Sequence, residues 1–269
     1  MLRPADAEKT RIAILAGSSE NAERLERAAL AIDEAASRGA RLTTVLDDDY
    51  PANLRLVHDL PPFLFYRGTL ERADARSIAV VGTRQASSDG LKRARQMARG
   101  LVQSGVTVLS GLARGIDTAA HEEALAQGGR TVAVLGTGIL RQYPPENTEL
   151  AERIVESGAL VSQFWPAQGP ARHTFPRRNV VTSGMSQGTV VVEASSTSGA
   201  KMQARLALGH GKQVFLIRDL VTRQQWAQGY LERGAIQVDS VADVLGCMTD
   251  ATRIEQVAHG RRQLTLDAL

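Results

Sequence analysis

A glycine-rich loop with one arginine is the stretch of the sequence best suited to binding a phosphate. Residues 110–117 read SGLARGID and stand between a short apolar run and a helical pattern, so the loop joins a strand to a helix. Gly111 and Gly115 allow backbone amides to approach a ligand, the helix start carries partial positive charge, and Arg114 adds a full cation. A tight turn whose glycines serve only close packing explains the same residues about equally well.

A second arginine is expected at the same edge of the fold. Gly82-Thr83-Arg84 follows the apolar run SIAVV, and the carboxyl ends of neighbouring parallel strands meet at one edge of a sheet. That edge is where ligands bind in open α/β sheets, especially where the strand order reverses. Arg84 and Arg114 should therefore converge, although a structural salt bridge is the competing explanation for either residue.

An aromatic ring beside two guanidinium groups indicates nucleic-acid binding. In FPRRN, residues 175–179, Phe175 can stack on a base, Arg177 and Arg178 can hold phosphates, and Asn179 adds an amide. Proline also suits the first turn of a helix. That alternative explains the proline better than it explains the arginine pair.

The stretch VVVEASSTSG, residues 190–199, supplies the supporting groups. Glu193 ends a strand, and we expect its carboxylate to orient Arg114 or Arg178 by ion pairing rather than to act as an acid or base. Ser198 can give a phosphate its hydroxyl or cap the next helix. Lys201, on that helix, completes the predicted phosphate-binding set.

These residues need a scaffold that brings strand ends together. Short apolar runs bounded by turn residues alternate with amphipathic helical patterns, which predicts an α/β fold: an extended Rossmann-like, doubly wound, mostly parallel sheet with helices on both faces. The expected strands are 77–81, 106–110, 130–135, 159–163, 188–193 and 212–217. The expected helices are 89–103, 115–127, 147–157, 176–186 and 199–210.

The ends of the chain have weaker patterns. We expect a strand at 11–16, a helix spanning about 25–36, a short strand at 41–46 and a connector over 50–68. The predicted domains are a small α/β extension and connector at 1–72, the Rossmann-like domain at 73–246, and a short tail at 247–269 without a winged helix.

Composition narrows the function further. Residues 165–225 contain eight basic and two acidic side chains, a net charge of +6 where the whole chain has +3, so an anion should bind mainly in the C-terminal half. The single Cys247 cannot form an intramolecular disulfide, and no apolar run reaches the length of a membrane span. We therefore expect a cytoplasmic protein that does not bind membranes.

Several enzyme classes lack their motifs. The sequence has neither GxxxxGK[ST] nor GxSxG, and GTGILR at 136–141 places an arginine where the third glycine of a dinucleotide fingerprint belongs. The five histidines are scattered without metal-ligand spacing, and a pair such as Asp117 and His121 is usually structural. We expect no metal, no cofactor and no catalytic residue.

Taken together, the motifs resemble the DNA-processing protein A (Smf) family in order and spacing. The resemblance covers roughly residues 40–217 and rests on YPANL at 50–54, PPFLFYRGTL at 61–70, IAVVGTR at 78–84, SGLARGID at 110–117, GGRTVAVLGTG at 128–138, YPPEN at 143–147, FPRRN at 175–179 and VVVEASSTSG at 190–199. It implies a non-enzymatic single-stranded DNA-binding protein that helps to load a RecA-type recombinase in DNA uptake or recombination, and a homodimer. It places Arg84, the Gly111–Gly115 loop, Phe175, Arg177, Arg178 and Asn179 in the DNA pocket.

Some positions depart from the family pattern. Arg218-Asp219 stands where a Pro-Gly turn is usual, Val180 follows Asn179 where a basic residue is common, and Ala200-Lys201 replaces Ser-Leu. A specialised role against foreign DNA is one variant that these departures leave open. The alternative function is a nucleotide-binding sensor or a phosphoribohydrolase-like enzyme, although the loop ASSTSG lacks the PGGxGTxxE pattern; a nicotinamide or flavin oxidoreductase ranks third.

Overall fold

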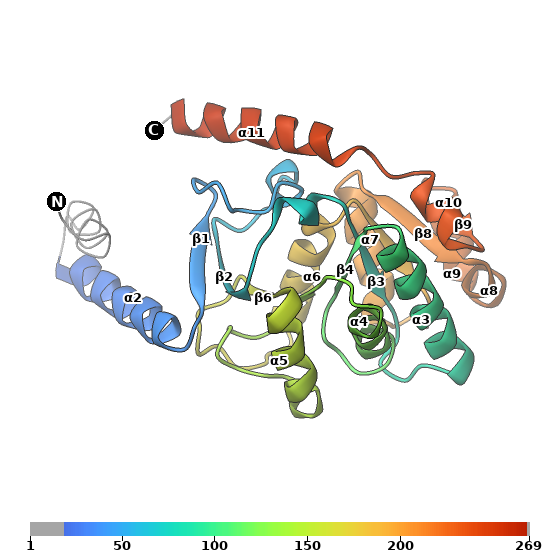
Figure 1. The fold of residues 1–269 in the computed structure, drawn as a ribbon, viewed down its shortest axis with the longest axis horizontal. Helices are drawn as coiled ribbons and strands as arrows, with labels where there is room; N and C mark the ends of the chain where they lie inside the picture. Colours follow the sequence, from blue (N-terminus) through green and yellow to red (C-terminus); the bar gives the residue numbers. More distant parts are fainter. Residues whose placement is uncertain (1–18, 268–269) are drawn as a thin grey trace.

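The computed structural model describes residues 19–267, and its centre is a nine-stranded sheet in the order β1-β2-β6-β5-β4-β3-β7-β8-β9 (Figure 1). The strands β3 to β9 run parallel, whereas β2 is antiparallel to both β6 and β1. Their bounds are β1 Arg41–Thr44, β2 Phe63–Gly68, β3 Ser77–Val81, β4 Thr107–Ser110, β5 Thr131–Val134, β6 Ala159–Ser162, β7 Gly188–Val191, β8 Gln213–Ile217 and β9 Ile236–Val238. The predicted doubly wound, mostly parallel fold is confirmed.

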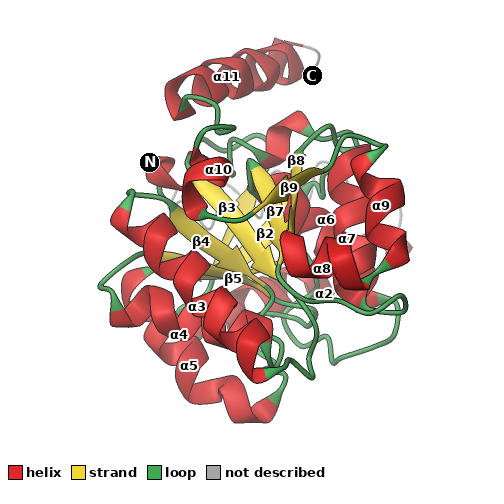
Figure 2. Ribbon diagram, turned by 90° about the vertical axis from the view of Figure 1, so that its right-hand side faces the viewer, coloured by secondary structure: helices red, strands yellow, loops and turns green. Residues whose placement is uncertain are grey.

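Helices cover both faces of this sheet (Figure 2). One face packs against α3 (Ser88–Gln103), α4 (Ile116–Ala126), α5 (Thr148–Ser157) and α10 (Val241–Leu245). The other face packs against α6 (Thr174–Met185), α7 (Gly199–Gly209), α8 (Arg218–Arg223) and α9 (Gln225–Leu231). Along β3 every residue is buried, with Ile78 and Val80 in one core and Ala79 and Val81 in the other. Burial on both faces is why these strands read as continuous apolar runs.

The strand order reverses beside β3. From β3 the chain builds outward through β4, β5 and β6, and it then returns to the other side of β3 with β7, β8 and β9. The loops that leave β3 and β7 therefore diverge to opposite faces. A crevice at the carboxyl ends of these two strands is the place where open α/β sheets bind their ligands.

The N-terminal part of the sequence differs from its prediction in one element. The segment expected to be a connector contains β2, whose residues Leu64, Phe65 and Tyr66 are buried. The sequence did not indicate this strand because the run is short and follows directly on Pro61-Pro62, which are typical of a turn or connector. Helix α2 (Ser19–Ser37) and β1 agree with the patterns, and the strand predicted at 11–16 lies outside the described residues. The sheet continues across residue 72, and the division into domains stays a prediction.

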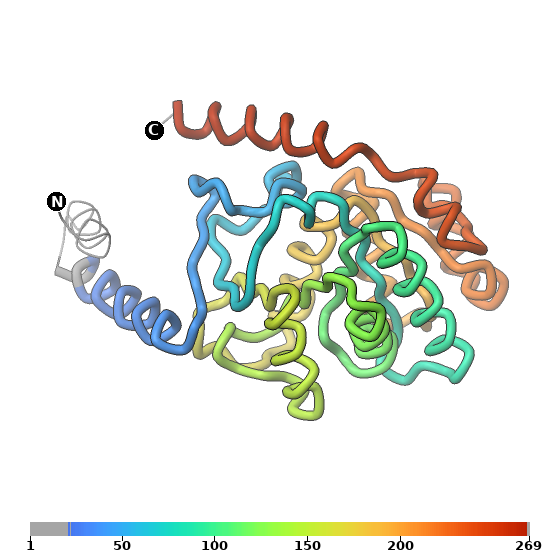
Figure 3. The backbone as a smooth tube through the Cα atoms, in the orientation of Figure 1, coloured from blue at the N-terminus to red at the C-terminus, as the bar shows by residue number. Residues whose placement is uncertain are grey.

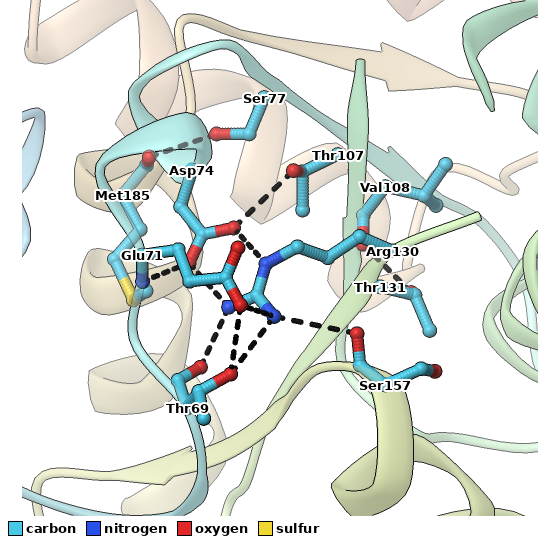
Figure 4. A network of polar contacts seen from close by, with 10 residues as sticks. All are labelled: Thr69, Glu71, Asp74, Ser77, Thr107, Val108, Arg130, Thr131, Ser157 and Met185. Atoms are coloured by element: carbon cyan, nitrogen blue, oxygen red, sulfur yellow. Dashed lines mark hydrogen bonds and ion pairs between the residues drawn. The ribbon is translucent and has the colours of Figure 1, made fainter. Parts of the chain in front are cut away.

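A partly buried network around Arg130 lies at the amino-terminal ends of the parallel strands, opposite the crevice (Figure 4). Arg130 precedes β5, and its Nε and Nη2 donate to the two carboxylate oxygens of Asp74 at 2.7 and 2.8 Å. Nη2 also donates to the carbonyl of Thr69 at 2.6 Å, and Nη1 lies 3.1 Å from a carboxylate oxygen of Glu71. Asp74 belongs to the 3-10 helix η2 (Arg72–Ala75), so the network ties the segment that enters β3 to the start of β5.

The last helix, α11 (Ala251–Asp267), turns back across the molecule towards the β1 side (Figure 3). It buries Ile254 and Ala258, and Arg261 and Arg262 donate to the carbonyls of Arg55 and Leu46. These contacts seat it on η1 (Leu54–Leu56) and η2. Across residues 19–267, no helix combines the length and the apolar character that spanning a membrane requires.

Candidate functional site

A pocket of about 560 Å³ opens at the carboxyl ends of β3, β4 and β7, where the strand order reverses. Its walls come from the loops that follow these strands and from the first turns of α6 and α7. It is lined by Val81, Gly82, Thr83, Arg84, Gln85, Gly111, Ala113, Arg114, Asp117, Phe175, Pro176, Arg178, Asn179, Thr182, Ser195, Ser198, Gly199, Ala200, Met202 and Gln203. The three arginines in this set carry positive charge to a space large enough for a nucleotide-sized ligand.

Arg178 is fixed in the wall of the pocket. The residue is only 8% exposed, and its Nη1 donates to the carbonyls of Gly111 and Val134 at 2.6 and 2.8 Å. Its Nε donates to Oδ1 of Asn179 at 3.2 Å. A Cβ at position 111 would lie 2.0 Å from the Arg178 Nη1, which explains why glycine stands there. Arg178 therefore joins α6 to the ends of β4 and β5 and holds a fixed positive charge at the pocket.

Asp117 occupies two of the loop amides that the sequence assigned to a phosphate. Its carboxylate accepts from the amides of Gly111 and Ala113 at 3.1 and 3.3 Å. Burial raises the pKa of Asp117, and the nearby positive charge of Arg178 opposes that shift. The chain thus supplies its own hydrogen-bond acceptor to the loop, because the carboxyl group in the first turn of α4 satisfies amides that would otherwise be unpaired. Sequence spacing did not reveal this competition.

Arg84 and Arg114 are the exposed cations of the pocket. The guanidinium carbon of Arg84 lies 5.1 Å from the ring centroid of Phe175. Among the described residues, no carboxylate oxygen lies within 4.0 Å of the Arg84 guanidinium nitrogens. Arg114 pairs with Glu146 at 3.3 Å, but the two side chains are 62% and 49% exposed. An ion pair this exposed contributes little free energy, so Arg114 can exchange Glu146 for a phosphate.

Phe175 is half-buried and supports its neighbours. A Cβ at position 136 would lie 2.6 Å from the Cδ1 of Phe175, so Gly136 permits the ring to pack onto the end of β5. The ring of Tyr143 lies 5.8 Å away at an angle of 53°, and Tyr143 is 37% exposed. Tyr143 is the aromatic residue that sequence reasoning missed. Its place in the YPPEN stretch was the available signal, but nothing in the sequence put it beside Phe175.

Three of the predicted phosphate-binding residues, Gly115, Arg177 and Lys201, do not line this pocket. Arg177 is exposed and its guanidinium carbon lies 5.7 Å from the ring centroid of Phe164, while the amine of Lys201 lies 5.7 Å from the ring centroid of Trp226. Neither residue lines the pocket, because successive residues on α6 and α7 point to different sides of each helix.

The supporting residues Glu193 and Ser198 both make hydrogen bonds within the chain. The prediction that Glu193 pairs with Arg114 or Arg178 is wrong: its Oε2 accepts from the hydroxyl of Ser87 at 2.7 Å and from the Ser87 amide at 3.2 Å. A carboxylate is favoured there because it meets the positive end of α3. Ser198 caps α7 by accepting from the amide of Ala200, as its alternative interpretation proposed. Gly115 immediately precedes α4 and has a φ of +79°, and a Cβ there would lie 2.4 Å from the carbonyl oxygen of Thr83 and 2.9 Å from that of Arg84.

Comparison with known proteins gives matches over most of the chain. A model of the family described as DNA recombination-mediator protein A matches residues 41–249. The DNA processing protein DprA of Streptococcus pneumoniae is 37% identical over 204 residues, which is 75% of this chain and 72% of that protein. Protein Smf of Escherichia coli is 39% identical over 73% of this chain and 53% of its own length. Protein Smf of Synechocystis is 37% identical over 68% of this chain, which spans about half (47%) of that relative.

Solved structures agree with the sequence matches. The X-ray structure of DprA from Streptococcus pneumoniae superposes with a TM-score of 0.73 and 33% identity, covering 93% of this chain and 88% of that one. DprA from Helicobacter pylori, whose structure is described for its single-stranded DNA binding mode, superposes with a TM-score of 0.67 over 77% of this chain and 94% of its own. At 24% identity this second match shows the shared fold.

Proposed function

The chain belongs to the DNA recombination-mediator protein A family, and from that premise we propose that it binds single-stranded DNA in the pocket beside β3 and β7. The observation that carries this proposal is the position of the pocket, at the reversal of strand order, with Arg84, Arg114 and Arg178 in its walls. Single-stranded DNA binding by the Helicobacter pylori relative supports the choice of ligand.

The exposed arginines are the groups that would hold phosphates. Arg84 and Arg114 stand in loops that leave adjacent strands, so a strand of DNA lying across this edge meets both. Arg178 adds a charge that is held in place, because its Nη1 donates to two backbone carbonyls and its Nε donates to the side chain of Asn179. A fixed positive charge beside two mobile ones favours a polyanion and imposes no sequence preference.

The aromatic cluster would receive a base. The Phe175 ring already contacts Arg84 and Tyr143, so its surface is partly covered by both. We therefore assign the outer contact with the base to Tyr143 and to the plane of the Arg84 guanidinium, with Phe175 as their support. Stacking of this kind accepts any base, because every base has a π-face.

We propose binding rather than catalysis. Two carboxylates near the pocket are committed to the fold, since Asp117 accepts from loop amides and Glu193 accepts from Ser87. Incubation with nucleoside monophosphates should release no base, and detection of free base would contradict this part of the proposal.

We extend the proposal to the biological role on the strength of the family description as a recombination mediator. The bound strand is passed to a RecA-type recombinase in the cytoplasm, during DNA uptake, recombination or a response to foreign DNA, and the chain acts as a homodimer. Faster assembly of recombinase filaments on a single strand when this chain is present tests the first statement. Light scattering of the purified chain tests the second.

The binding experiment is a fluorescence anisotropy titration of a labelled single-stranded oligonucleotide at several salt concentrations. If about three phosphates are neutralised, log affinity falls with log salt at a slope near −2, from roughly 0.7 per phosphate. Arg84→Gln and Arg114→Gln should each weaken binding and reduce that slope by about 0.7. Arg153→Gln on α5, an exposed cation outside the pocket, is the matched control and should leave both unchanged. Binding that does not depend on salt, or equal losses in all three variants, contradicts the proposed site.

A further inference from the structure

A cluster of two histidines and one aspartate lies at the opposite end of α7 from the DNA pocket. The ligand atoms of His58, Asp59 and His210 all lie within 4.8 Å of one another. His210 follows the last residue of α7, whereas Gly199 at the start of that helix lines the pocket, and a helix of this length spans about 16 Å. The cluster therefore belongs to a different surface from the proposed DNA site.

His210 is held in the orientation that a metal ligand needs. Its side chain is 1% exposed, and its Nδ1 lies 2.9 Å from the hydroxyl of Ser183 on α6. This contact directs Nε2 to the Asp59 carboxylate at 2.8 Å. Histidine ligands in proteins are usually fixed in this way, by a hydrogen bond to the ring nitrogen that does not bind the metal. Metal ions bind the neutral imidazole, through the ring nitrogen that carries no proton.

His58 and Asp59 approach the same point from an exposed loop. The ring of His58 lies 5.6 Å from the ring of His210, edge to face at 78°. A hydrogen bond between Asp59 and His210 would fasten this loop to α7 without any ion, but it gives no role to the second imidazole. We propose that His58, Asp59 and His210 bind one divalent ion of the zinc class, with solvent in the remaining position. Two imidazoles and a carboxylate are a ligand set that zinc accepts.

The surroundings of the cluster limit its affinity. Lys212 stands two positions after His210, and its amine donates to the carbonyl of Asn53 at 3.4 Å. An ammonium group so near the cluster opposes the binding of a cation, so we expect weaker binding than at a zinc site without such a neighbour. Binding would join the loop before β2 to the end of α7 and stabilise the folded chain by mass action.

The test is equilibrium dialysis of the full chain, stripped with a chelator, against Zn²⁺, with Co²⁺ absorption as a second measurement. We expect one Zn²⁺ per chain and a visible Co²⁺ spectrum of low-symmetry coordination. His58→Ala, an exposed substitution that leaves the His210–Asp59 contact in place, should weaken binding at least tenfold, and Asp59→Asn should do the same. His259→Ala removes an exposed histidine on α11 and is the matched control.

Three results would overturn the proposed metal site. The proposal is overturned if the wild-type chain binds no stoichiometric Zn²⁺, if His58→Ala binds as tightly as wild type, or if His259→Ala loses binding to the same degree. Circular dichroism of each variant shows that a loss of metal is not a loss of fold. Because the cluster is at the other end of α7, His58→Ala should leave the affinity for single-stranded DNA unchanged, so failure of the metal site is distinguishable from failure of the DNA site.

Discussion

Replacing Arg178 by alanine should affect stability before it affects binding. The guanidinium donates to two carbonyls, those of Gly111 and Val134, and to the side chain of Asn179, within a residue that is 8% exposed. A hydrogen bond from a charged donor contributes about 1.5–3 kcal/mol, and acceptors left buried without a partner keep their full desolvation cost. Losing two such bonds to buried carbonyls should lower the free energy of unfolding by about 3–5 kcal/mol.

That loss is a large fraction of the roughly 5–15 kcal/mol that keeps a domain folded. Arg178→Ala should remain folded at low temperature but unfold at a clearly lower urea concentration. Arg178→Lys keeps the charge, and its single amine cannot reproduce the guanidinium fork, so about half of the loss should remain. Arg177→Ala, the exposed neighbour on the same helix, is the control and should change stability by less than about 0.5 kcal/mol.

The assay is urea unfolding followed by circular dichroism, paired with DNA titration under conditions where each variant is folded. Arg178→Ala should lose both stability and affinity, whereas Arg84→Ala, an exposed residue, should lose affinity alone. The reasoning is refuted if the free energy of unfolding of Arg178→Ala lies within about 0.5 kcal/mol of wild type, the range of an exposed substitution. It is equally refuted if Arg177→Ala is destabilised to the same extent.

Three further changes test other parts of the structure. Tyr143→Ala should weaken DNA binding by about 1–3 kcal/mol while Tyr143→Phe binds normally, as anisotropy would show; equal losses would argue against stacking. Burial lowers the pKa of His121 to about 3, whereas in the unfolded chain its pKa is near 6.5. The unfolded chain therefore binds this proton first as the pH falls below about 6.5, and the free energy of unfolding falls by up to about 1.4 kcal/mol per pH unit. His121→Gln should therefore flatten the decline of urea midpoints between pH 6.5 and 4, and an unchanged decline would contradict this. Arg130→Ala, which leaves the buried Asp74 unpaired, should destabilise the chain by about 2–4 kcal/mol in urea yet bind DNA normally when folded; a wild-type midpoint would show that the network contributes little.

Apolar patterning predicted the central strands closely because they are buried on both faces. The predicted strand 77–81 coincides with β3, and the strand predicted at 159–163 differs from β6 by one residue. Strand β2 was missed for a physical reason: it lies in the segment 50–68, which showed no strong periodicity, and its position in the sheet depends on pairing with β6, which is distant in sequence. Local pattern cannot report such pairing.

The site residues show the same contrast between what local sequence pattern predicts and what depends on contacts between distant segments. The sequence predicted Arg84 and Arg114 from their positions after parallel strands and Phe175 and Arg178 from the FPRRN stretch, and all four line the pocket. It assigned Glu193 to an arginine, since charge alone does not distinguish that partner from the amide and hydroxyl of Ser87. It included Lys201, whose side chain turns to Trp226.

The sequence by itself determined the class of fold, the edge of the sheet where the pocket opens and the positive charge placed there, because these depend on strand periodicity and on which residue follows each strand. Only the tertiary structure decided which groups remain available to a ligand. It paired Asp117 with the loop amides and fixed Arg178 on two carbonyls. It also brought His58 and Asp59 to His210, which stands 151 positions after Asp59 in the sequence. Hydrogen-bond partners and ligand clusters depend on distances in space, and residues far apart in sequence acquire those distances only when the chain packs.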